Sequence, residues 1–120
     1  MTRLRQAREA LEEARALRDS GMDAPLVQSA LYQAYYYPVL ALVYGGRMRD
    51  SMQSVTIGLF EQQFVRTGLI SREHGDAVRK AFELKPKCSG GGLTASGDEV
   101  ELLLSRAEEF IRDAESYLAT

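Results

Sequence analysis

Apolar residues recur at intervals of three and four positions along most of this chain of 120 residues. This spacing places them on one face of an α-helix, whereas a half-buried strand would show strict alternation. Ser96 and Glu99 have the spacing of a capping box, so we expect a helix to begin there. The apolar stripe that follows comprises Val100, Leu103, Leu104, Ala107, Phe110, Ile111, Ala114 and Leu118. The sequence therefore predicts an all-α fold.

Glycines, prolines and capping residues divide the chain into five predicted helices. They cover about residues 2–20, 23–45, 51–66, 71–84 and 96–118. In the third helix Val55, Leu59 and Phe60 are expected to face inward, and Gly68 is placed to form a left-handed C-cap after it. Short connections between amphipathic helices favour antiparallel neighbours. We therefore predict a five-helix antiparallel bundle.

The chain is long enough for one domain with a single core and too short for two. We expect one domain over residues 1–120, with a flexible, glycine-rich loop at about residues 86–96. The stretch from Ala24 to Gly46 has no charge but holds five tyrosines, which favours a buried helix over a membrane span. The lone cysteine, Cys88, fits a reducing compartment, so we expect a cytoplasmic protein.

The sequence offers no metal or cofactor motif. One cysteine and one histidine cannot complete a structural zinc site, so no metal is predicted. The run Gly90-Gly91-Gly92 is not followed by the Lys-Ser/Thr pair of a phosphate-binding loop, and no strand pattern precedes it. We therefore expect no cofactor.

Four segments resemble the small HEPN-domain proteins, a family of helical bundles. The segment from Phe60 to Ile70 is similar to the family's F-x-x-x-F-V-K/R-T-G-x-I stretch, and Ala81-Phe82-Glu83-Leu84 to its A-F-E-L-R stretch. Ala34-Tyr35-Tyr36 and Ala107-x-x-Phe110-Ile111 resemble two further family segments. The resemblance covers most of the chain and implies an up-and-down four-helix core that forms a homodimer.

The HEPN family includes metal-independent RNases, which the resemblance implies use an R-x4-6-H motif near the last helix. In this chain the histidine is His74, and Arg66 and Arg72 precede it by eight and two positions, which does not match that motif. Many relatives also carry a T-H-x-G segment, and its histidine aligns with Gln53 here. Lys85 replaces the arginine of A-F-E-L-R. These changes indicate a non-catalytic member, and no catalytic residue is assigned.

Three interpretations stay open at this point. The first is a binding module, the HEPN half of a toxin–antitoxin-like pair with a nucleotidyltransferase, which the resemblance implies. The second is an RNase toxin with a rearranged site that uses His74 with Arg66 or Arg72. The third is a nucleotide-binding regulatory module. We expect His74 to be a surface or capping histidine in the first turn of its helix. Residues predicted to contact an acidic partner, nucleotide or RNA are Arg47, Arg49, Arg66, Lys85, Lys87 and Tyr36.

Overall fold

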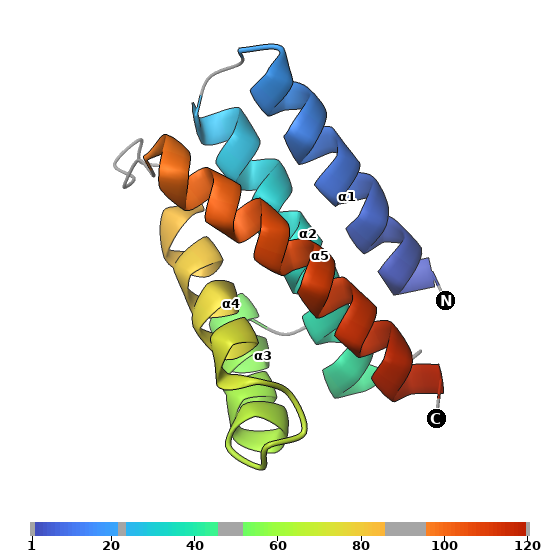
Figure 1. Ribbon diagram of the computed structural model, residues 1–120. Coiled ribbons are helices and arrows are strands. Elements are labelled where there is room, and N and C mark those ends of the chain that lie inside the picture. Colours follow the sequence, from blue (N-terminus) through green and yellow to red (C-terminus); the bar gives the residue numbers. More distant parts are fainter. Residues whose placement is uncertain (1, 22–23, 46–51, 86–95, 120) are drawn as a thin grey trace.

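The computed structural model describes residues 2–21, 24–45, 52–85 and 96–119. Its elements are α1 (Thr2–Asp19), α2 (Ala24–Tyr44), α3 (Gln53–Phe60), the π-helical turn η1 (Glu61–Val65), α4 (Arg72–Leu84) and α5 (Gly97–Ala119). Within these ranges there is no strand, and the five α-helices form a bundle (Figure 1). The predicted all-α helical bundle is confirmed.

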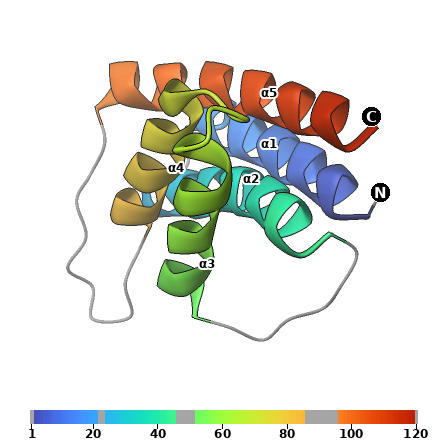
Figure 2. The ribbon, with the colours of Figure 1, turned by 90° about the horizontal axis from the view of Figure 1, so that it is seen from below.

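Helix α2 is the centre of the bundle. It contacts α1, α3, α4 and α5, and α1 and α5 also contact each other. The chain from α3 through η1 to α4 forms a hairpin that lies against α2 and α5 (Figure 2). The uncharged, tyrosine-rich sequence of α2 is suited to this position because all of its neighbours cover it.

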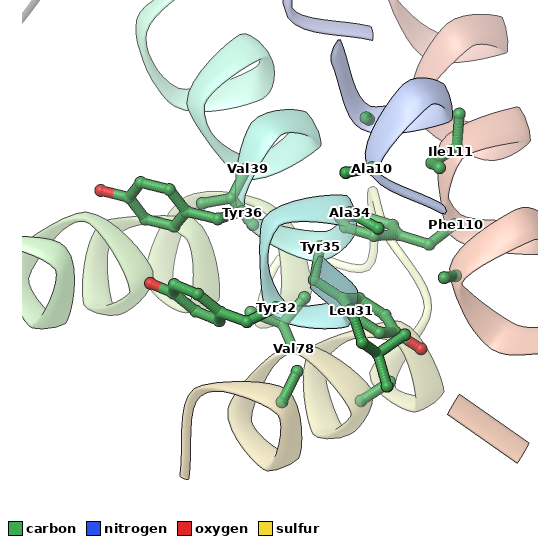
Figure 3. Packing of buried hydrophobic residues seen from close by; sticks show 14 of the residues in the cluster. Ala10, Leu31, Tyr32, Ala34, Tyr35, Tyr36, Val39, Val78, Phe110 and Ile111 are labelled. Carbon is green, nitrogen blue, oxygen red and sulfur yellow. The ribbon is translucent and has the colours of Figure 1, made fainter. Parts of the chain in front are cut away.

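The centre of the core is aromatic and lies where α2, α3 and α5 meet. The ring centroids of Tyr35 and Phe110 are 6.1 Å apart, and those of Phe60 and Phe110 are 5.6 Å apart. All three side chains are fully buried, and Figure 3 shows two of them, Tyr35 and Phe110, among their neighbours. The hydroxyl group of Tyr35 donates to the carbonyl oxygen of Leu103. A buried phenol needs such a partner, because an unpaired hydroxyl in the core would be costly.

The helix boundaries follow the capping chemistry read from the sequence. The Ser71 hydroxyl oxygen accepts a hydrogen bond from the backbone N–H of Glu73, 3.1 Å away, at the start of α4. At the start of α5 the Glu99 N–H donates to the Ser96 hydroxyl (3.2 Å), and the Glu99 carboxylate accepts from the Ser96 N–H (3.4 Å). This reciprocal pair is the predicted capping box. Gly68 has a φ of 80°, which confirms its predicted left-handed conformation.

Glutamate side chains of α5 form ion pairs with arginine side chains of α1. The guanidinium group of Arg8 donates to Glu115, that of Arg15 to Glu108 (3.2 Å), and that of Arg18 to Glu101. These side chains are at least partly exposed, so each pair contributes little stability. The three pairs run in opposite order along the two helices, as expected for antiparallel neighbours.

The third predicted helix differs from the structure in two respects. The α-helix ends at Phe60, and the π turn η1 continues it to Val65. Val55 and Leu59 were expected to face inward, but Val55 is 52% exposed and Leu59 is only half-buried. The buried face of this segment is instead formed by Ile57, Phe60 and Phe64. The prediction for Val55 was wrong because Ile57 and Phe60 lie on a different face of α3.

Candidate functional site

A polar cluster joins three segments at one end of the α3–α4 hairpin. The side-chain oxygen of Gln53, the first residue of α3, accepts a hydrogen bond from the Tyr32 hydroxyl of α2 at 2.8 Å. The same oxygen accepts a second one from the ammonium group of Lys85, which directly follows α4, at 2.7 Å. We call Tyr32, Tyr36, Gln53 and Lys85 the tyrosine–lysine cluster.

Aromatic rings form the base of this cluster. The Lys85 nitrogen lies 5.3 Å from the ring centroid of Tyr32 and 5.8 Å from that of Phe82, within the range of cation–π contacts. The Tyr36 ring stacks on Tyr32 with centroids 5.5 Å apart. In Figure 3 the hydroxyl groups of Tyr32 and Tyr36 point to the same side, away from the hydroxyl of Tyr35. The two phenols and the ammonium group are therefore presented together.

The groups of the cluster that are available to a ligand can all donate hydrogen bonds. Burial raises the pKa of the Tyr32 phenol, and the neighbouring Tyr36 raises it further, so Tyr32 stays protonated at neutral pH. The amide nitrogen of Gln53 and the hydroxyl of Tyr36 have no hydrogen-bond partner among the residues that the structure describes. The ammonium group of Lys85 has three N–H donors, and Gln53 uses one of them. Such a set favours an anionic or oxygen-rich ligand.

His74 lies in the core, which corrects the expectation of a surface histidine. It is 4% exposed, its Nε2 is 2.7 Å from the Asp113 carboxylate on α5, and its ring lies 5.4 Å from Phe110. Its Nδ1 is buried without a partner among the described residues. The sequence does hold a signal for this burial. His74 is spaced three, four and seven positions from Ala77, Val78 and Ala81, and this spacing places it on the buried face of α4.

Arg66 and Arg72 line a groove in which His74 takes no part. The groove lies between η1 and the beginning of α4 and has a volume of about 530 Å³. Its other lining residues are Gly58, Glu61, Gln62, Val65, Gly75 and Asp76. The structure thus brings the two predicted arginines together but places the predicted histidine elsewhere.

The remaining predicted site residues Arg47, Arg49 and Lys87 lie outside the described residues, as do Cys88 and nearly all of the predicted flexible loop. In the four described ranges, no group of three or more His, Cys, Asp or Glu side chains is arranged to hold a metal ion. None of the helices in those ranges combines the length and the apolar character needed to cross a membrane.

Sequence comparison supplies one relative. A protein of Thermotoga maritima named "UPF0332 protein" is 30% identical to this chain over 114 residues, which are 95% of this chain and 81% of the relative. No family model matches the chain, and no solved structure does.

Proposed function

The chain belongs to the UPF0332 family, and from this premise we propose that it is a non-catalytic binding module, the HEPN half of a pair with a nucleotidyltransferase protein. The HEPN resemblance supplies the class of partner. The observation that carries the proposal is the tyrosine–lysine cluster, in which Gln53 is held by Tyr32 and Lys85. By the HEPN resemblance, Gln53 stands where many HEPN proteins have the histidine of the T-H-x-G segment.

The chemistry of the cluster favours holding a ligand over moving a proton. RNA cleavage without a metal needs a side chain that accepts the proton of the 2′-hydroxyl near neutral pH. The amide of Gln53 has no titratable proton in this range, and the raised pKa of Tyr32 keeps its phenol protonated at neutral pH, so neither group can accept the proton. His74 is buried against Phe110 with its Nε2 next to the Asp113 carboxylate, and it belongs neither to the cluster nor to the lining of the groove.

The outer face of α3 supports self-association. Met52 is 72% exposed and Val55 is 52% exposed, and Leu59 continues their stripe one turn further on. No residue of α3 carries a charge. In a two-fold dimer the same patch meets itself, so a patch without charge avoids like-charge contacts. We therefore propose a homodimer through α3, next to the tyrosine–lysine cluster.

The first experiment tests catalysis. Purified wild-type protein and the variants His74→Ala and Lys85→Gln are incubated with single-stranded RNA in buffer containing a chelator. The proposal expects RNA to stay intact with all three. Cleavage by the wild type would overturn it, and loss of that cleavage in a His74→Ala variant that circular dichroism shows to be folded would establish the rearranged RNase. Cleavage lost only in Lys85→Gln would place catalysis at the cluster and would also overturn it.

The second experiment tests the partner. Co-expression with a minimal nucleotidyltransferase of the same organism should yield a complex that survives size-exclusion chromatography. Lys85→Gln should weaken this complex. Lys80→Gln is the matched control, because Lys80 is a nearby cation on α4 whose ammonium group pairs with Glu99 at 3.4 Å. If no such nucleotidyltransferase binds, or if both variants behave alike, the proposed pairing at the cluster is wrong.

A second candidate function is binding of a nucleotide at the same cluster, and its excess of hydrogen-bond donors favours it. A nucleotide that binds only the folded protein raises the melting temperature with its concentration. Absence of a shift with ATP, GTP and their monophosphates at millimolar concentration would exclude this function. A saturable shift that Lys85→Gln abolishes would establish it.

A further inference from the structure

We propose that the groove lined by Arg66 and Arg72 is a second, separate binding site, and that its ligand is a small phosphate monoester that also carries hydroxyl groups. We call it the arginine groove. It lies at the opposite end of the α3–α4 hairpin from the tyrosine–lysine cluster, where Val65 of η1 meets Gly75 of α4. Its volume of about 530 Å³ is in the range of small-molecule sites.

The backbone is shaped to form this groove. In η1 the hydrogen bonds span five residues, as the 2.9 Å bond from the Arg66 N–H to the Glu61 carbonyl oxygen shows. A π turn widens the helix locally, and such turns are frequent at functional sites. Opposite it, a Cβ atom at Gly75 would lie 2.9 Å from a methyl carbon of Val65, so the glycine allows α4 to approach the turn. At Gly58 a Cβ atom would meet nothing within 4 Å, which leaves that part of the groove open.

Two guanidinium groups of the groove are uncommitted. Arg66 and Arg72 are exposed, and neither guanidinium group has an ion pair or hydrogen bond with any residue of the described ranges. The carboxylate of Glu61 also lines the groove, but it is bound by Arg79. Other arginines are held by glutamates: Arg8, Arg15, Arg18, Arg106 and Arg112. Two guanidinium groups at one groove, both without a partner in the described part of the chain, suit a phosphate, whose oxygens they can bind in pairs.

The carboxylate of Asp76 favours a ligand that carries hydroxyl groups beside its phosphate. It lines the groove on α4 and has no ion pair within the described residues. A carboxylate next to a phosphate site repels a long polyanion but accepts hydrogen bonds from hydroxyl groups. A ligand with one phosphate and neighbouring hydroxyls uses all three side chains, whereas pyrophosphate uses only the arginines. This difference makes the proposal testable with simple probes.

The probes are ribose 5-phosphate, AMP and inorganic pyrophosphate, titrated calorimetrically into the full chain at moderate salt. We expect saturable binding of ribose 5-phosphate, weakened roughly tenfold or more in Arg66→Gln and in Arg72→Gln. Arg112→Gln is the control, because Arg112 lies on α5 in an exposed pair with Glu108, and it should bind as the wild type does. All of these side chains are exposed, so the variants should fold, and circular dichroism checks this.

Asp76→Asn tests the contact with the hydroxyl groups of the ligand separately from the contact with its phosphate. It should weaken ribose 5-phosphate and leave pyrophosphate unchanged or bound more tightly. AMP binding with the same dependence on Arg66 and Arg72 would support the proposal and identify a nucleotide as the source of the phosphate. No saturable binding of any probe, or an equal loss in Arg112→Gln, would overturn it. Binding lost in Lys85→Gln but kept in Arg66→Gln would also overturn it, because the ligand would then occupy the tyrosine–lysine cluster.

Discussion

Two glycines of the α3–α4 hairpin lie in helices but have opposite surroundings. A methyl group added at Gly58 would meet no atom within 4 Å, whereas one added at Gly75 would lie 2.9 Å and 3.1 Å from the two methyl carbons of Val65. We predict that Gly58→Ala stabilises the protein and that Gly75→Ala does not. Comparing the two variants distinguishes the higher helix propensity of alanine, which acts at both sites, from the steric clash with Val65, which acts only at Gly75.

The magnitudes follow from two opposing terms. Alanine in a helix interior is more favourable than glycine by about 0.8–1 kcal/mol, and this term is common to both sites. At Gly75 the new methyl group must push Val65 away by several tenths of an ångström, and overpacking of this kind costs about 1–3 kcal/mol. Gly58→Ala should therefore raise the free energy of unfolding by about 0.5–1 kcal/mol. Gly75→Ala should lower it by about 0–2 kcal/mol.

Urea unfolding followed by circular dichroism at 222 nm measures both changes. The double variant Gly75→Ala/Val65→Ala provides the internal check, because it removes both methyl groups and leaves the Val65 Cβ at an ordinary contact distance of 3.5 Å. In the Val65→Ala background, Gly75→Ala should become stabilising. The coupling between the two sites should be about 1–3 kcal/mol, as expected for residues in direct contact.

The reasoning is refuted if Gly75→Ala stabilises the protein as much as Gly58→Ala does. It is also refuted if the effect of Gly75→Ala is the same with and without the methyl groups of Val65. Either result would mean that α4 does not approach η1 as closely as described, and the arginine groove would then need a different shape.

Three further predictions concern a helix cap, the loss of stability at low pH and the core. Ser96→Ala should lower the free energy of unfolding by about 1 kcal/mol, because it removes the side-chain acceptor of the capping box, and urea unfolding would show no change if that cap were unimportant. The hydrogen bond from Arg8 lowers the pKa of Glu115, so this contribution to stability is complete above the ordinary carboxyl pKa and is lost as the pH falls through the lowered value. The free energy of unfolding of Glu115→Gln should therefore fall less than that of the wild type as the pH is lowered. Denaturation profiles in which both proteins lose the same stability at low pH would contradict this. Tyr35→Phe should cost about 0.5–1.5 kcal/mol, since it removes the hydrogen bond from the buried hydroxyl group to the Leu103 carbonyl oxygen, and an unchanged melting temperature would argue against that hydrogen bond.

Local sequence was sufficient for the helices and their ends. The capping box at Ser96 and the left-handed Gly68 formed as predicted, and the helix predicted from residue 71 begins with a cap at Ser71. Their hydrogen bonds and dihedral angles involve residues only a few positions apart. The apolar spacing likewise identified the core face of α5. It failed at Val55, where apolar residues lie on more than one face of a short helix and only packing decides between them.

The sequence by itself thus determined that this chain is an all-α bundle and where most of its helices begin and end. Only the tertiary structure decided which side chains meet. Gln53 lies 21 positions from Tyr32 and 32 from Lys85, and His74 lies 39 positions from Asp113. Helical periodicity is a short-range property that fixes the face on which a residue lies. The contacts of that face depend on how the helices pack, which is determined by the burial of the whole core.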